Sequence, residues 1–123
     1  MLTKLAHPCV IKVVDTYYKK VFVCMVLDLY AGGDMMKGMS RHWAAKGMVD
    51  IVHVQRLARQ MWQAIAWIHQ NNCVHRDVKG DNLMLDMEAV HDPKNRLYLA
   101  DLGTVFEVVL GSRLKFRCGT KQY

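Results

Sequence analysis

Long apolar runs are absent from this sequence, and so is the pattern of an export signal. No uninterrupted apolar stretch approaches the ~18 residues that read as a membrane-spanning helix. The amino terminus also lacks a basic region followed by an apolar segment, the pattern of a secretory signal peptide. The sequence therefore predicts neither a membrane span nor a signal peptide.

Paired cysteines are absent too. The cysteines stand far apart, and none of them forms a Cys-x-x-Cys pair. This spacing indicates neither a zinc site nor a disulfide framework. Free thiols fit a reducing compartment, so we expect an intracellular, cytoplasmic location. The four cysteines are Cys9, Cys24, Cys73 and Cys118.

Acidic residues are fewer than basic ones, 11 against 17, which gives a formal net charge of +6. Such an excess can indicate nucleic-acid or acidic-membrane partners. No nucleic-acid-binding motif accompanies it here, so we expect no nucleic-acid partner. Hydrophobic residues make up 52% of the chain and charged residues 23%, as in a globular protein.

One short stretch, residues 75–82, concentrates the chemistry of the chain: it reads His-Arg-Asp-Val-Lys-Gly-Asp-Asn. Phosphoryl transfer needs positioning and charge neutralisation more than covalent help. Asp77 can accept a hydroxyl proton and Lys79 can meet a phosphate, while Asn82 and the later Asp101 offer oxygens of the kind that Mg²⁺ prefers. His-Arg-Asp alone would also fit a solvated turn.

At these residues the chain resembles the protein kinase superfamily. Lys79, two residues after the candidate base, is similar to the serine/threonine branch. The resemblance runs through His75-Arg76-Asp77, Asn82 five residues later, Asp101-Leu102-Gly103 in place of the usual Asp-Phe-Gly, and Cys118-Gly119-Thr120 with Tyr123.

The resemblance implies an ATP-dependent, Mg²⁺-requiring kinase that phosphorylates serine or threonine hydroxyls of protein substrates. Asp77 would be the base, and Lys79 would bind and neutralise the phosphoryl group. Thr120 would bridge these two side chains, while Asn82 and Asp101 would hold magnesium. A structural acid at Asp77 and a solvent-facing lysine at Lys79 are the plainer alternatives.

The implied fold is α+β, a partial protein kinase-like fold. Residues 1–27 would end the small lobe, residues 28–34 would form the hinge, and residues 35–123 would begin the large lobe. The β-branched runs Cys9–Val14 and Val21–Leu29 predict an antiparallel strand pair of that small lobe.

The resemblance also implies nucleotide contacts in and after the second of these runs. Leu27 would be the gatekeeper behind the adenine, and the Asp28 carbonyl with the Tyr30 amide and carbonyl would meet its rim. Asp34 would lie near the ribose or the substrate, and Met84 would form an apolar floor. Read alone, this run fits a buried strand ending in a Gly-Gly turn better than a nucleotide site.

Helical periodicity predicts a short helix over Met35–Arg41 and a long one from Val49 to Asn71-Asn72. Asp50 is placed to cap the long helix. We expect Trp62 and Trp67 on that helix to be packing anchors rather than ligand platforms.

Two further strands are predicted at Leu83–Leu85 and Arg96–Ala100. The polar segment 86–95 between them contains Asp92-Pro93, which cannot continue a strand. We interpret this segment as a surface insertion in a hairpin, without an assigned role. His75 and Leu102 are expected to pack and orient rather than to react.

The segment from Gly103 to Arg117 corresponds in position to an activation loop, and the resemblance implies that Arg76 would pair with a phosphate there. Lys115, Phe116 and Arg117 occupy the place of the usual acceptor, so Ser112 is the nearest hydroxyl. We therefore expect that activity does not depend on a conventionally placed phosphate.

Two alternatives stay open: a nucleotide-binding pseudokinase or inactive kinase fragment, and a small-molecule phosphotransferase of related fold. The resemblance places the glycine-rich lid, the phosphate-binding lysine and its glutamate partner before Met1. It places the Ala-Pro-Glu segment after Tyr123. The expectation is that these 123 residues alone do not turn over ATP.

Overall fold

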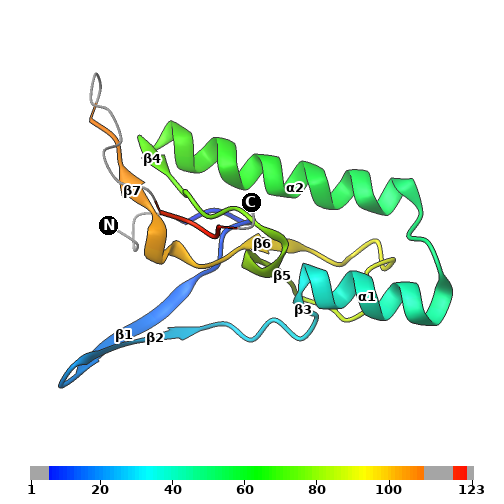
Figure 1. The fold of residues 1–123 in the computed structure, drawn as a ribbon, viewed down its shortest axis with the longest axis horizontal. Helices are drawn as coiled ribbons and strands as arrows, with labels where there is room; N and C mark the ends of the chain where they lie inside the picture. Colours follow the sequence, from blue (N-terminus) through cyan, green and yellow to red (C-terminus); the bar gives the residue numbers. More distant parts are fainter. Residues whose placement is uncertain (1–5, 110–117, 122–123) are drawn as a thin grey trace.

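The computed structural model describes residues 6–109 and 118–121, which form an α+β arrangement of small sheets and helices (Figure 1). The predicted fold class is confirmed. The strands are β1 Val13–Lys19, β2 Phe22–Leu27, β3 Gly33–Asp34, β4 Cys73–Val74, β5 Leu83–Leu85, β6 Leu97–Leu99 and β7 Phe106–Glu107. The helices are α1 Met35–Lys46, α2 Ile51–Gln70 and the 3₁₀ turns η2 Gly80–Asn82 and η3 Leu102–Thr104.

The core lies where α2 packs on the sheet β3-β5-β6 (Figure 1). Leucines at alternate positions of β5 and β6 point into it, because successive side chains of a strand face opposite sides. From α2 the buried residues are Leu57, Ala64 and Ile68, which share one face of the helix. No helix among the described residues has the length and apolarity to cross a membrane.

The long helix begins at Ile51, two residues after the predicted Val49, and ends at Gln70, directly before Asn71 as predicted. Asp50 caps it, since its Oδ1 accepts the Val52 N–H at 3.0 Å, and Asn71 follows its last residue. Trp67 packs against the core as expected. The prediction for Trp62 was wrong: 62% of this residue is exposed, because its position points away from the sheet.

The shorter helix, α1, runs five residues further than the predicted Met35–Arg41 and ends at Lys46. Residues 42–46 contain no helix breaker, and Gly47 then ends the helix with φ at +79°. At the other end Asp34 is the N-cap, its Oδ1 accepting the Lys37 N–H at 2.9 Å.

The strand pair of the N-terminal part exists and is antiparallel, but its predicted bounds were wrong. β1 begins at Val13 and continues through Tyr17, Tyr18 and Lys19, which had been expected to connect the strands. The turn is confined to Lys20 and Val21, and Lys20 has φ at +50°. The resulting hairpin extends away from the core (Figure 1).

Residues 9–11, expected to begin the first strand, join the core instead. Ile11 N–H donates to the Leu99 carbonyl at 3.0 Å, and Leu99 N–H donates to the Cys9 carbonyl at 2.8 Å. Val10, 3% exposed, forms a parallel bridge with Leu99. This apolar run therefore covers the edge of β6, and the hairpin begins only after it.

The predicted strands Leu83–Leu85 and Arg96–Ala100 pair as a hairpin, the second of them shortened to Leu97–Leu99. The connection between them is not a simple surface insertion. Val90 is 1% exposed and Asn95 0% exposed. The Asn95 amide accepts the Met87 N–H and donates to the carbonyls of Met87 and Ala89. A polar sequence predicted exposure, whereas the amide here organises the backbone of its own loop.

Candidate active site

Residues 75–82 follow shortly after the end of α2. Asn72 reverses the chain with φ at +55°, and β4 then pairs antiparallel with β7. The loop that begins at His75 comes next, and its last residues form η2, which continues directly into β5. Rigid elements on both sides thus hold a short polar loop, the usual setting for reactive groups.

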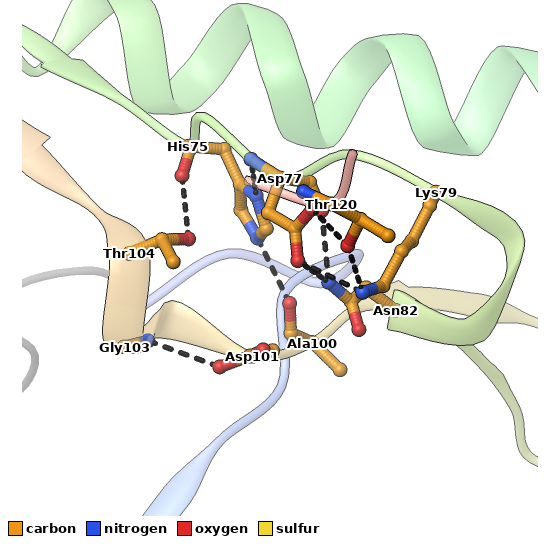
Figure 2. Close-up of polar contacts among 9 residues, drawn as sticks. All are labelled: His75, Asp77, Lys79, Asn82, Ala100, Asp101, Gly103, Thr104 and Thr120. Atoms are coloured by element: carbon orange, nitrogen blue, oxygen red, sulfur yellow. Dashed lines mark hydrogen bonds and ion pairs between the residues drawn. The ribbon is translucent and has the colours of Figure 1, made fainter. Parts of the chain in front are cut away.

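Asp77 is the centre of the polar network in this loop (Figure 2). Its Oδ1 accepts the backbone N–H and the hydroxyl of Thr120, at 2.9 and 2.8 Å. Its Oδ2 lies 3.0 Å from Lys79 Nζ and accepts Asn82 Nδ2, also at 3.0 Å. Lys79 donates in turn to the Thr120 hydroxyl at 2.5 Å. The structure therefore brings these four predicted site residues together.

These contacts keep Asp77 ionised. The hydrogen bond from Lys79, followed by that from Thr120, lowers the pKa of Asp77 to about 2 from 3.8. The same hydrogen bond raises the pKa of Lys79. Each charge stabilises the other, so both groups are charged at neutral pH.

Thr120 reaches Asp77 because Gly119 precedes it. Gly119 has φ at +99°, and a Cβ there would lie 2.6 Å from the Arg76 carbonyl oxygen. Only glycine lets the chain pass this close to the loop in this backbone conformation. The position of Thr120 thus depends on a glycine that stands next to it in the sequence.

His75 is 2% exposed and holds the loop in place through both of its ring nitrogens. Its Nδ1 accepts the Asp77 N–H at 3.3 Å, so its Nε2 donates to the Ala100 carbonyl at 2.8 Å (Figure 2). Ala100 stands directly before Asp101. One buried imidazole therefore links the loop of Asp77 to the strand end that carries Asp101.

Arg76 holds the loop to the segment after Asp101. Its Nε donates to the Thr104 carbonyl at 2.7 Å, and its guanidinium carbon lies 5.0 Å from the centre of the Phe106 ring. The Thr104 hydroxyl donates to the His75 carbonyl at 2.8 Å. Sequence reasoning missed Thr104 and Phe106; the β4–β7 register, Val74 opposite Phe106, brings them here. Ser112 lies outside the described residues.

Asn82 and Asp101, the predicted magnesium ligands, each carry a side-chain oxygen of the kind that Mg²⁺ prefers. Asn82 uses Nδ2 for Asp77, which leaves its oxygen as the available ligand atom, and its carbonyl accepts the Ala100 N–H at 2.8 Å. Asp101 is exposed, and its Oδ1 accepts the Gly103 N–H at 3.3 Å. No three His, Cys, Asp or Glu side chains group as metal ligands in residues 6–109 and 118–121. An amide and one carboxylate suit Mg²⁺ that phosphate and water complete.

Asp101 and Arg76 also share an unusual backbone conformation. Their φ angles are +55° and +70°, in the left-handed region that costs a non-glycine residue about 1 kcal/mol or more. The surrounding hydrogen bonds hold both residues there. Such positions cluster at functional sites, which is the pattern seen around this loop.

The predicted nucleotide contacts are distributed over neighbouring elements. β3 pairs with β5 so that Asp34 lies opposite Met84, and Met84 lies opposite Tyr98 on β6. The Tyr30 ring stands 4.7 Å from the Tyr98 ring, centre to centre. Asp34, Tyr30 and Met84 are therefore close to one another along this sheet.

Four of the predicted nucleotide-contact residues have features that the sequence did not indicate. The Asp34 carboxylate is engaged as the α1 cap and in an ion pair with Lys37 at 2.9 Å. The Tyr30 carbonyl already accepts the Gly33 N–H at 3.0 Å. Leu27 ends β2 and is 41% exposed. Asp28, directly after it, is exposed as well.

Known proteins resemble the chain over its whole length. A calcium/calmodulin-dependent protein kinase type 1 of Caenorhabditis elegans is 30% identical over 123 residues, which cover 100% of this chain and 33% of that relative. Phosphorylase b kinase gamma catalytic chain, liver/testis isoform, from Mus musculus and from Homo sapiens is 28% identical over 117 residues, 95% of this chain and 26% of the relative. The chain thus spans about a quarter to a third of these curated relatives.

The family model for the protein kinase domain matches residues 1–123. This match covers the loop centred on Asp77, the Asp101 strand end and the Thr120 segment that the structure joins. The chain belongs to the protein kinase family.

Proposed function

We propose that the protein carrying this sequence is an ATP-dependent serine/threonine protein kinase. The observation that supports it most is the network at Asp77, an ionised carboxylate held by Lys79, Thr120 and Asn82. The Asp101 carboxylate is near enough to add, after Asp77, to the raised pKa of Lys79. A pseudokinase would not need an acid, an ammonium and metal-binding oxygens in one place.

In this proposal Asp77 positions the substrate hydroxyl more than it deprotonates it. A pKa of about 2 makes the carboxylate a weak base, since general bases work best with a pKa near the operating pH. Phosphoryl transfer proceeds through a loose transition state in most analyses, so alignment of the hydroxyl is the larger contribution. Asp77 would accept the proton once the oxygen has bonded to phosphorus.

Lys79 would serve both partners of the reaction. Its ammonium bonds to Asp77 and Thr120, and three donors allow it to reach a phosphate oxygen as well. Electrostatic stabilisation of the equatorial oxygens is the main catalytic contribution in this chemistry. Thr120 would keep the lysine and the acid in register.

ATP and Mg²⁺ are the proposed cofactors. The Asn82 oxygen and the Asp101 carboxylate would hold Mg²⁺, which would neutralise charge on the nucleotide phosphates. Met84 would contact the adenine from below, and the hinge, residues 28–34, would meet its rim through Asp28 and Tyr30. Leu27 would lie behind the ring and Asp34 near the ribose. The proposal also assigns residues 1–27 to the end of the small lobe and residues 35–123 to the first part of the large lobe.

The test is phosphoryl transfer to a serine- or threonine-containing protein by the native protein of full length. We expect Asp77→Asn to lower kcat by roughly 10²-fold or more, because it removes the carboxylate that positions the substrate hydroxyl. Asp15→Asn, an exposed acid on the β1–β2 hairpin, is the matched control and should retain activity. Full activity in Asp77→Asn would refute the proposed function.

A further inference from the structure

Three histidines from three separate segments lie close together, and none of them belongs to the Asp77 network. His42 lies on α1, His53 on α2 and His91 in the connection between β5 and β6. The His91 ring is 5.3 Å from the His42 ring and 6.5 Å from the His53 ring, centre to centre. The proposed kinase chemistry uses none of these residues.

Lys46 joins this cluster from the last turn of α1. Its Nζ lies 3.0 Å from His91 Nε2. A lysine ammonium has only donors, so Nε2 must be the acceptor and His91 must be neutral in this arrangement. The proton of neutral His91 is then on Nδ1, which is buried and has no hydrogen-bond partner among the described residues.

The connection around His91 is otherwise tightly attached to both helices. Arg56 on α2 donates to the Asp92 carbonyl at 2.6 Å and to the Val90 carbonyl at 3.1 Å. Val90 is 1% exposed, and a Cβ added at Gly38 on α1 would lie 3.4 Å from its Cγ2. His91 thus stands between two residues that are fixed in place, which limits how far its ring can withdraw.

We propose that His42, His53, His91 and Lys46 form a proton-sensitive latch, which holds the 86–95 connection against α1 and α2 at neutral pH and releases it in acid. Protonation of His91 replaces the Lys46 hydrogen bond by two facing cations.

The charges that face His91 come from all the elements packed around it. α1 contributes Lys46 and His42, and α2 contributes His53 and Arg56. Lys46 is the main cause that lowers the pKa of His91, followed by burial and by the two other histidines. Asp92 in the connection opposes them without reversing the shift.

The sign of the effect follows from proton linkage. Because the pKa of His91 is lower in the fold than its ordinary 6.5, the released form binds a proton first as the pH falls. The latched form is therefore fully favoured above pH 6.5 and loses free energy progressively below it. The connection joins β5 to β6, so its release would loosen the hairpin that aligns Asn82 with Ala100.

Amide hydrogen exchange by NMR on the native protein, with a chelator present, tests the latch. The reporters are the Asp92 and Asn95 amides, which donate within the connection to Ala89 and Asp92. We expect their protection factors to fall more between pH 7.5 and pH 5.5 than those of α2, because the released form takes up the proton that the latched form resists. Equal changes in both places would overturn the proposal.

Variants separate the latch from general acid sensitivity. His91→Gln keeps an acceptor for Lys46 but cannot become a cation, so the extra loss of protection should disappear. His69→Gln, at the exposed end of α2, is the control and should behave as the wild type. If His91→Gln retains the wild-type pH dependence, the proposal fails.

Lys46→Met provides a readout that does not require the His91 variant to fold. Removing the ammonium should raise the titration midpoint of His91, followed by its imidazole resonances in NMR spectra. A midpoint that does not move when Lys46 is replaced would equally overturn the latch.

Discussion

Asp77 shows how single residues in this chain are specified by their partners. Both carboxylate oxygens are used, Oδ1 by Thr120 and Oδ2 by Lys79 and Asn82. Three of these four residues stand within six positions of each other, and the fourth comes from residue 120. The protonation state of Asp77 is therefore a sensitive measure of whether both segments are in place.

The first prediction concerns the titration of Asp77. Its pKa is lowered to about 2 from 3.8, so the network stabilises the fold fully above pH 3.8 and loses its contribution as the pH falls towards 2. Carboxyl ¹³C NMR should show no titration of Asp77 above pH 4. A loss of activity in acid that begins above pH 4 must therefore come from the titration of another group. A midpoint at or above 3.8 would contradict the network.

Thr120 is the subject of the second prediction. Thr120→Val keeps the shape and the backbone N–H bond to Asp77 but removes the hydroxyl that Asp77 and Lys79 share. We expect the pKa of Asp77 to rise and kcat to fall about tenfold, the effect of losing ~1.4 kcal/mol of positioning. Thr120→Ser retains the hydroxyl and should stay close to the wild type. Identical kcat values in Thr120→Val and the wild type would contradict the bridging role.

The sequence predicted the members of this network because their identities and spacing are specific. It could not predict Thr104, Phe106 or the Ala100 carbonyl. A backbone carbonyl has no side-chain signature, and Thr104 and Phe106 reach Arg76 only through the β4–β7 pairing. Local sequence thus indicates the candidate reactive groups, while the groups that hold them in place come from strand pairing at long range.

Among the elements, the β5–β6 connection depends most on one buried polar side chain. Asn95 is 0% exposed, and its amide satisfies three backbone groups. Arg56 binds the same connection from α2. Polar contacts of Arg56 therefore join α2 to this connection, in addition to the apolar packing of the buried Val90.

The third prediction follows from this arrangement. Asn95→Ala leaves the Met87 and Ala89 backbone groups without their partner, and each unsatisfied buried group costs about 1–3 kcal/mol. We expect the free energy of unfolding, from urea titration, to fall by about 2–4 kcal/mol. Lys94→Ala changes an exposed neighbour and should stay within about 0.5 kcal/mol of the wild type. A loss below ~0.5 kcal/mol in Asn95→Ala would show that water replaces the amide.

Element boundaries were predicted where a specific cap marks them. Asp50 and Asn71 lie directly before and after α2. The Asp50 side chain accepts the Val52 N–H, and the Asn71 backbone N–H donates to carbonyls of the last turn. Periodicity alone did less well. Trp62 fits an apolar helix but faces outwards, and residues 9–11 fit a strand but pair with Leu99. Hydrophobicity indicates that a residue favours burial; it does not say which surface will cover it.

At the scale of the whole molecule, burial is concentrated away from the β1–β2 hairpin (Figure 1). Every residue of β1 after Val13 is exposed, and Cys24 alone in β2 is half-buried. An isolated two-stranded hairpin is at best marginally stable in water. The core cluster includes buried side chains of α2, β5 and β6 but none of β1 or β2.

The fourth prediction is therefore a gradient of local stability across the 123-residue chain. Amides of β1 and β2 should exchange hydrogen at least ~10-fold faster than those of α2 and β6, measured by mass spectrometry, because opening the hairpin exposes little new apolar surface. Leu57→Ala removes a side chain that is 2% exposed and should cost roughly 2–5 kcal/mol. It should speed exchange in α2 and β6 and leave the hairpin unchanged, since the hairpin opens without the core. Equal acceleration in all these elements would instead mean that hairpin and core unfold as one unit.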